Sequence, residues 1–212
     1  MQRFRNKTMR YIDFHQVFSS LGCFDTNQVK LVQPDFDRTA LNRWVAKGYL
    51  IQLKNGIYAF RHWATQPNAD LVAANRIYRP SYISTYTALA HYGMIPEFVA
   101  QTTSVSTLKT TAFSNELGKF EYRHIKPDLF FGYHIIASTT LRDILIATPE
   151  KALIDLLYLS PVLKTEQDML ELRLDEDYMG EEFDYNRALA ILQRIGNKAL
   201  SHRFTLIEKT YR

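Results

Sequence analysis

Apolar residues recur at helical spacing in two short segments near the beginning of the chain. Residues 10–21 place apolar side chains three and four positions apart, which predicts a helix with one buried face. Residues 26–32 predict a second, shorter helix, with Thr26 or Asn27 as its N-cap. Gly22 lies between the two segments, at a position where a residue that tolerates positive φ commonly ends a helix. We therefore expect two separate helices here.

A third helical segment follows Pro34 and is amphipathic. Its predicted N-cap is Asp35 or Asp37, and Gly48 stands where a left-handed C-cap is expected. The apolar face of this helix consists of Ala40, Leu41, Trp44 and Val45. The opposite face carries polar and basic side chains, namely Arg38, Thr39, Asn42, Arg43 and Lys47.

The next residues, YLIQLKNGIYAF, alternate around an Asn55-Gly56 pair. Asn-Gly is a strong hairpin signal, because both central residues of a type I′ turn need positive φ. With a two-residue turn, the predicted pairs are Lys54–Ile57, Leu53–Tyr58, Gln52–Ala59 and Ile51–Phe60. This register places the large apolar side chains on one face and Lys54 at the tip of the hairpin. Three short helices and a basic-tipped hairpin are the plan of a winged helix-turn-helix.

After the hairpin, the polar segment 62–68 contains a proline and marks the predicted domain boundary. The remaining pattern predicts helices over 69–78, 84–92 and roughly 165–174, 185–195 and 197–209, and strands over 102–109, 118–126 and 132–138. Residues 141–147 are ambiguous between strand and helix. A further helix begins after Thr148 as N-cap, with Pro149 as its first residue.

The predicted fold class is therefore α+β, with two domains. Residues 1–63 form the winged helix-turn-helix, and residues 69–212 form a mixed α/β domain with a small sheet and several helices. The 212 residues, 46% of them hydrophobic, suffice for a buried core in each domain.

Charge is distributed unevenly along the chain. Residues 1–67 contain 10 Lys and Arg against 4 Asp and Glu, a balance of +6, whereas residues 68–212 contain 16 against 18, a balance of −2. A basic first third predicts a module that binds a polyanion, and charge alone does not distinguish nucleic acid from a membrane surface. The longest apolar-rich run, ALIDLLYLSPVL, is broken by Asp155 and Pro161, so we expect no membrane span.

The polar face of the third helix matches the chemistry of a DNA major groove. Arginine pairs with guanine and asparagine with adenine, while lysine at a hairpin tip suits a backbone phosphate. The residues expected to approach bases are Arg38, Thr39, Asn42 and Arg43, and those expected to contact the DNA backbone are Lys47, Lys54 and Asn55. Arg3, Arg5, Lys7 and Arg10 form a basic arm that either touches DNA or is a solvated tail.

Three segments after the third helix carry a resemblance to a known family. The winged-helix pattern ending in GIYAF, then ISTYTALAHYGMIPE, and then a small sheet and ATPEKALIDLLYL resemble, in this order, the AbiEi-like antitoxins, which are transcriptional regulators of bacterial abortive-infection toxin–antitoxin operons. The resemblance covers about residues 10–160. It implies an N-terminal domain that binds operator repeats and represses its own operon. It also implies a second domain that is required to neutralise a nucleotidyltransferase-like toxin, by a functional or physical interaction.

Two alternatives to this function are a nuclease and a protein-docking adaptor. Pro127-Asp128 resembles the start of a PD…ExK nuclease site, but Glu150 and Lys151 are adjacent instead of separated by one residue. A winged helix that binds no DNA would serve as the adaptor. The chain also lacks a glycine-rich phosphate loop. We expect no enzyme activity, no catalytic residues, no metal and no cofactor.

The remaining chemically active side chains have structural explanations. His91, His124 and His134 are the most metal-like set, with no acidic or cysteine partner at ligand spacing, and the last two are expected on neighbouring strands. Asp155 lies one helical turn after Lys151, so an ion pair at the edge of the buried face accounts for it, with toxin contact as the alternative. The lone Cys23 excludes an internal disulfide and favours a cytoplasmic protein. A homo-oligomer on repeated half-sites stays open.

Overall fold

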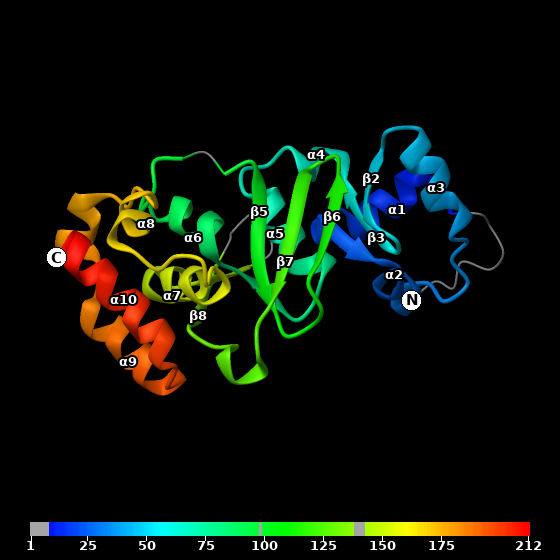
Figure 1. Ribbon diagram of the computed structural model, residues 1–212. Helices are drawn as coiled ribbons and strands as arrows, with labels where there is room; N and C mark the ends of the chain where they lie inside the picture. The colour runs from blue at the N-terminus through cyan, green and yellow to red at the C-terminus, as the bar shows by residue number, and fades with distance from the viewer. Residues whose placement is uncertain (1–8, 98, 138–142) are drawn as a thin grey trace.

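The computed structural model describes residues 9–97, 99–137 and 143–212, which fold into a mixed α/β protein with two sheets. The N-terminal part of the chain holds a three-stranded sheet and lies at the right of Figure 1. A six-stranded sheet occupies the centre, and the C-terminal helices lie at the opposite end. The chain thus passes from one end of the molecule to the other.

The N-terminal part contains the three predicted helices, the predicted hairpin and an additional short strand. Its elements are α1 (Tyr11–Phe18), a 3-10 turn (Ser19–Leu21), β1 (Cys23–Asp25), α2 (Thr26–Val32), α3 (Thr39–Ala46), β2 (Leu50–Lys54), β3 (Ile57–Phe60) and α4 (Arg61–Ala64). The strand β1 pairs antiparallel with β3 and completes a sheet in the order β1-β3-β2. The N-cap of α2 is Asp25, and not Thr26 or Asn27, because the Asp25 carboxylate accepts two backbone N–H groups of the first turn.

The hairpin contains a bulge, and the predicted register is therefore wrong at three of its four pairs. The observed pairs are Leu50–Phe60, Ile51–Ala59, Gln52–Tyr58 and Lys54–Ile57, so only the last was predicted correctly. Leu53 is the extra residue, and its carbonyl oxygen accepts a hydrogen bond of 3.0 Å from Nδ2 of Asn115 in the second sheet. Gly56 has a φ of 80°, whereas Asn55 is not among the described residues with positive φ. The turn is therefore not type I′.

The second part of the chain contains the six-stranded sheet and six helices among its described residues. The helices are α5 (Ala69–Ile77), α6 (Thr85–His91), α7 (Pro149–Leu159), α8 (Glu166–Leu170), α9 (Tyr185–Ile195) and α10 (Lys198–Tyr211). The strands are β4 (Ser81–Ile83), β5 (Gln101–Ser106), β6 (Thr111–Asn115), β7 (Gly118–His124), β8 (Tyr133–Ile136) and β9 (Ile144–Ala147). Short helical turns cover Pro127–Leu129 and Tyr178–Glu182. The strands β4 and β6 were not predicted.

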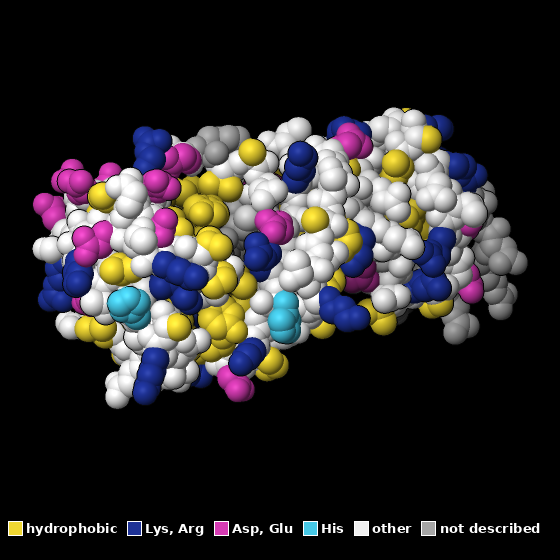
Figure 2. All heavy atoms as spheres, in the orientation of Figure 1, with side chains coloured by type: hydrophobic (Ala, Val, Ile, Leu, Met, Phe, Trp, Pro, Cys, Tyr) yellow, Lys and Arg dark blue, Asp and Glu magenta, His cyan; other side chains and the backbone are white. Residues whose placement is uncertain are grey.

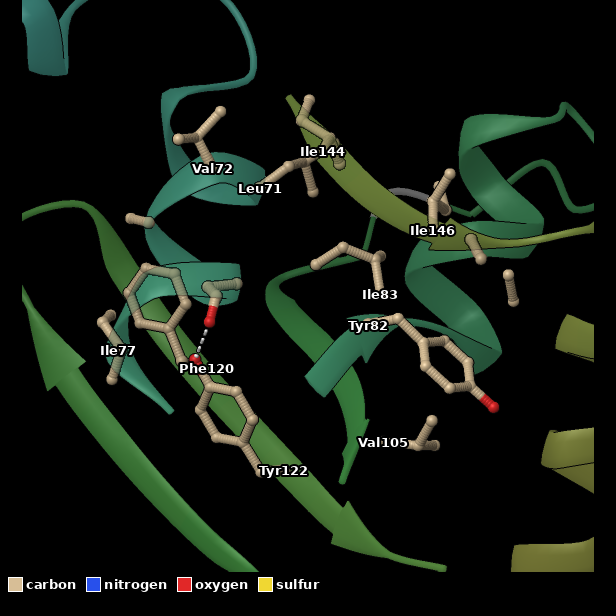
Figure 3. Packing of buried hydrophobic residues seen from close by; sticks show 14 of the residues in the cluster. Leu71, Val72, Ile77, Tyr82, Ile83, Val105, Phe120, Tyr122, Ile144 and Ile146 are labelled. Atoms are coloured by element: carbon tan, nitrogen blue, oxygen red, sulfur yellow. Dashed lines mark hydrogen bonds between the residues drawn. The ribbon is translucent and has the colours of Figure 1, made fainter. Parts of the chain in front are cut away.

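The sheet order is β6-β7-β5-β4-β9-β8, which places the three-residue strand β4 near the middle. β4 pairs antiparallel with β5 and parallel with β9. Figure 3 shows Ile83 of β4 close to Ile146 of β9, with the side chains of α5 on the same side of the sheet. The hydroxyl of buried Tyr122 donates a hydrogen bond of 2.7 Å to the carbonyl oxygen of Ala74, which ties β7 to α5 (Figure 3).

The helix α7 is buried along eight consecutive residues, from Glu150 to Leu157, and packs against α6, α9 and α10. Its start was predicted correctly. The Thr148 hydroxyl accepts the backbone N–H of Lys151, and Pro149 is the first helical residue. In the described ranges, none of the helices combines the length and the apolar character that crossing a membrane requires.

Polar contacts join the N-terminal part to the second sheet, where the edge strand β2 lies beside the edge strand β6 (Figure 1). The Arg61 guanidinium forms an ion pair with Glu116 at 2.7 Å and donates a hydrogen bond to the carbonyl oxygen of Gly48. The predicted boundary at 62–68 therefore lies directly beside a bonded contact between the two parts. α4 covers its first residues, and α5 begins just after it.

Candidate nucleic-acid interface

The helix α3 is fixed to the body of the N-terminal part by its apolar face. Ala40, Leu41 and Trp44 are buried, as predicted. The Trp44 ring lies 4.7 Å from the ring of Phe14 in α1, measured between centroids, and 5.5 Å from that of Tyr11. These aromatic contacts hold the helix in a defined orientation, so the direction in which its other face points is also defined.

The opposite face of α3 is open to solvent. All five side chains that the sequence assigned to it are exposed, namely Arg38, Thr39, Asn42, Arg43 and Lys47. They lie four positions apart in two rows, so that Arg38 precedes Asn42, and Thr39 precedes Arg43 and Lys47. At a rise of about 1.5 Å per residue, this face extends over about 13 Å of helix. The structure thus brings together five of the seven predicted side chains.

A carboxylate lies at the beginning of this face and engages two of its members. Asp37 accepts the backbone N–H of Thr39 at 2.9 Å and the Thr39 hydroxyl at 2.6 and 2.7 Å. These hydrogen bonds, with a smaller contribution from the charge of Arg43, hold the pKa of Asp37 below its usual value. One Arg43 guanidinium nitrogen lies 3.8 Å from the same carboxylate. Asp37 thereby fixes the Thr39 hydroxyl and lies within ion-pair distance of Arg43.

Asn55 and Lys54, the two predicted contacts at the hairpin tip, differ in position. Asn55 is exposed in the turn. Lys54 flanks the turn and pairs with Ile57, but its Nζ donates a hydrogen bond of 3.2 Å to the carbonyl oxygen of Ile77 and lies over the rings of Tyr78 and Phe113. This ammonium is directed into the contact with the second sheet, and the predicted contact between Lys54 and phosphate stays a prediction.

Of the four basic residues predicted to form an arm at the beginning of the chain, the structure describes Arg10 alone. Arg3, Arg5 and Lys7 lie outside the described residues. Arg10 precedes α1 and forms a two-pronged ion pair with Asp13, with its Nε atom 3.0 Å from a carboxylate oxygen. On the face shown in Figure 2, Lys and Arg side chains are spread over the N-terminal end, whereas Asp and Glu gather near α8.

The predicted ion pair between Lys151 and Asp155 is confirmed, but it lies in the core and not at the edge of the buried face. Lys151 is fully buried and Asp155 is 2% exposed. The hydroxyls of Tyr82 and Ser84 donate to the Asp155 carboxylate at 2.9 and 2.8 Å, and Lys151 Nζ also donates to the Tyr82 oxygen. Asp155 therefore offers no surface to a partner protein.

Burial disfavours the charged forms of Asp155 and Lys151, whereas their mutual attraction favours these forms. Loss of water contact raises the pKa of Asp155, while the charge of Lys151 and three hydrogen bonds oppose the rise. The same burial lowers the pKa of Lys151, and Asp155 opposes that change. The two side chains satisfy each other, which accounts for ionisable groups within the apolar helix α7.

The three histidines of the predicted metal-like set do not lie on neighbouring strands. His124 ends β7 and His134 lies in β8, and β5, β4 and β9 separate these two strands. Both histidines and His91 are exposed. In the part of the chain that the structure describes, no group of three or more His, Cys, Asp or Glu side chains could hold a metal ion.

Two residues of the nuclease-like pattern, Glu150 and Lys151, have charged partners elsewhere in the protein. Glu150 is buried and lies 3.6 Å from Arg187, and Lys151 pairs with Asp155. Asp128 lies exposed in the helical turn that follows β7. Cys23 is buried, as expected for a structural thiol.

No protein-family model matches the chain, and no curated protein matches it at a significant level.

Sequence reasoning missed two contacts between the N-terminal part and the second part of the chain, because each joins residues that are far apart in the sequence. The Arg61 ion pair with Glu116 joins residues 55 positions apart, and no periodic pattern marks such a pair. The same holds for Lys54 and Ile77. The bonding of Asp37 to Thr39 is local: Asp37 was one of the two predicted N-caps, and it bonds Thr39 although the N-cap position of the helix is Arg38.

Proposed function

We propose that residues 1–63 form a winged helix-turn-helix that binds double-stranded operator DNA through α3. The observation that carries this proposal is the exposed row of Arg38, Asn42, Arg43 and Lys47 on a helix whose other face is locked into the core. The order of the elements supports it, since a strand follows the first helix and a hairpin follows the third. Forked cationic and amide side chains on a fixed helix suit base edges in a major groove.

The residues of the interface have separate roles in this proposal. Arg38, Thr39, Asn42 and Arg43 approach base edges, because they lie at the N-cap and within the first five residues of α3. Lys47 at the end of the helix and Asn55 in the hairpin turn contact the DNA backbone, where a cation or an amide serves regardless of sequence. Asp37 limits the freedom of Arg43 before DNA is bound, which favours a single arginine geometry.

We further propose that the chain acts in the cytoplasm as repressor and antitoxin of an abortive-infection-type operon, without catalysis, against a nucleotidyltransferase-like toxin. This part rests on the resemblance of two segments to AbiEi-like antitoxins. Those segments, TALAHYG and TPEKALIDLL, correspond to α6 and α7, which pack against each other in the core. The assembly of several copies on repeated half-sites is compatible with this role.

The DNA-binding proposal is tested by fluorescence anisotropy with labelled DNA from upstream of the gene, at several salt concentrations. Arg43→Ala should weaken specific binding by about 1–3 kcal/mol and relax specificity at one base pair. Lys47→Ala should weaken binding to all sequences alike and reduce the salt slope by about 1. Lys119→Ala, an exposed cation on β7, is the control and should bind as the wild type does. Wild-type affinity in both α3 variants would refute the assigned face.

One observation favours the adaptor as a second candidate. Leu31 and Val32, at the end of α2, are 85% and 63% exposed. Large exposed apolar side chains of this kind suit contact with another protein. This contact is compatible with DNA binding by the neighbouring helix. Failure of the wild type to bind upstream DNA even at low salt would favour this role over that of a repressor. The antitoxin role is tested separately, by expressing the chain with the nucleotidyltransferase-like toxin and measuring growth.

A further inference from the structure

The second part of the chain contains a cleft of about 720 Å³ that none of the functions above uses. It opens between the end of α5, the beginning of β4 and the segment around β8 and β9. Its volume lies within the range of pockets that enclose small molecules. The lining residues used below are Arg76, Arg79, Phe130, Tyr133 and Asp143.

Two guanidinium groups in this lining have no carboxylate partner. Among the described residues, no Asp or Glu oxygen lies within 4.0 Å of Arg76 or Arg79, although Asp143 lines the same cleft. Nη2 of Arg76 is buried and has no hydrogen-bond acceptor. A buried cationic donor without an acceptor costs free energy, so its presence points to an anion that completes the site.

The other polar groups of the lining are already bonded within the protein. The Asn75 amide exchanges two hydrogen bonds with the backbone of Leu145, at 2.8 and 3.3 Å. The Ser81 hydroxyl donates to the carbonyl oxygen of Tyr78. Of the Arg79 donors, Nε is used by the carbonyl oxygen of Asn75. The donors that remain for a ligand therefore belong to the two guanidinium groups, which match the geometry of phosphate oxygens.

An aromatic wall accompanies these cations. The rings of Phe130 and Tyr133 lie 5.4 Å apart, and each packs against the buried ring of Tyr82, at 5.0 and 4.8 Å. Tyr82 in turn is held by Asp155 and Lys151, so the wall is anchored to the core. Planar apolar rings of this kind bind the face of a nucleobase.

We propose that this cleft binds a nucleotide, with its phosphate on Arg76 and Arg79 and its base against Phe130 and Tyr133. A bare phosphate would leave most of the 720 Å³ unfilled, and an uncharged ring would leave the buried Arg76 nitrogen without an acceptor. Both arginines also line a small cavity beside Asp25 and Gln28 of the N-terminal part. The phosphate end of the cleft therefore lies at the contact between the two parts of the chain.

The experiment is calorimetric titration of the full chain with AMP, GMP, CMP and UMP, and with adenosine and inorganic phosphate as truncated ligands. We expect at least one nucleotide to bind at least tenfold more tightly than either truncated ligand, because each of these lacks half of the contacts. Arg76→Met and Arg79→Gln should each weaken that nucleotide at least tenfold. Arg173→Gln, which removes an exposed guanidinium paired with Glu97, is the matched control and should leave binding unchanged.

The stability of the free protein separates a ligand-binding role of Arg76 from a structural one. Without ligand, Arg76→Met should melt at the temperature of the wild type or above it, because it removes a buried donor that has no acceptor. The proposal is overturned if none of the four nucleotides binds. It is also overturned if inorganic phosphate alone binds as tightly as the nucleotides do. A lower melting temperature with unchanged nucleotide binding in Arg76→Met also overturns it. The titration contains no DNA, so its outcome is independent of the proposed repressor function.

Discussion

The Nζ atom of Lys54 donates a hydrogen bond to the carbonyl oxygen of Ile77, at a distance of 3.2 Å, and the same ammonium lies 4.6 Å from the centre of the Phe113 ring. A side chain with the sequence position of a wing tip thus joins the N-terminal part to the second sheet. Its charge serves the contact between the two parts of the chain.

Replacement of Lys54 by methionine should therefore lower stability more than DNA affinity. The loss of one hydrogen bond and two cation–π contacts should reduce the free energy of unfolding by about 1–2 kcal/mol. Urea denaturation measures this change, with Asn55→Ala in the exposed turn as a control that should stay near wild type. Unchanged stability together with a shallower salt slope in DNA binding would restore the role as a phosphate contact.

Breaking the buried ion pair on one side should be far more costly than replacing both partners. Lys151→Met leaves the Asp155 carboxylate buried without its counter-charge and should destabilise the protein by about 3–5 kcal/mol. The double variant Lys151→Met with Asp155→Leu should recover most of this loss, because no charge then stays buried. Equal losses in the single and double variants, measured by urea denaturation, would contradict this account.

Gly22 and Gly48 can be compared, since both have a positive φ, of 63° and 72°. A Cβ at Gly22 would overlap the indole of Trp63, whereas a Cβ at Gly48 meets nothing within 4 Å. Gly48→Ala should cost about 1–2 kcal/mol from backbone strain alone. Gly22→Ala should cost about 1–3 kcal/mol more, because the core must move to admit a methyl group. Equal melting temperatures for the two variants would show that the indole yields freely.

The stability of the protein should fall as the pH is lowered from 7.5 to 5.5. Partial loss of water contact at two surface histidines, and then the proximity of His15 to His62 and of His134 to His91, lower the pKa of His62 and of His91. The unfolded chain, in which histidine has a pKa of about 6.5, therefore binds these protons more readily than the folded one. The stabilisation is complete above that pH and is lost as the pH falls through it towards the folded-state values.

Chemical denaturation at pH 7.5, 6.5 and 5.5 measures this dependence. His62→Gln and His91→Gln should each reduce the change between these values, and exposed His202→Gln should not. The low pKa of Asp37 acts in a more acidic range, because a carboxylate with a lowered pKa loses its contribution only near and below pH 4. A pH dependence that persists unchanged in both variants would exclude the histidines as its source.

Much of the fold could be predicted wherever the signals are local. The range 185–195 predicted for α9 is the observed one, and Thr148 with Pro149 located the beginning of α7. The strand β4 escaped prediction because three residues between Pro80 and Ser84 are too few to show a period. The strand order was equally inaccessible, since β4 pairs with β9 across more than 60 residues, and this is why His124 and His134 were assigned to neighbouring strands.

The candidate interface shows the same division between local and distant causes. The helical period correctly separated the exposed Arg43 and Lys47 from the buried Trp44, since this depends only on the turn of one helix. The position of Lys54 depends on Ile77 and Phe113, which belong to the second part of the chain. The cleft with Arg76 has no sequence signal at all, because its walls come from three separate segments, 75–81, 130–133 and 143–145.

The central position of β4 has a consequence for the order in which the protein can form during its synthesis. The three-stranded sheet needs only residues 23–60, so it can close as soon as this segment has left the ribosome. The six-stranded sheet cannot close until β9 has emerged, because β4 and β8 both depend on it. The three-stranded sheet would thus exist on the nascent chain while its larger neighbour still exposes unpaired strand edges.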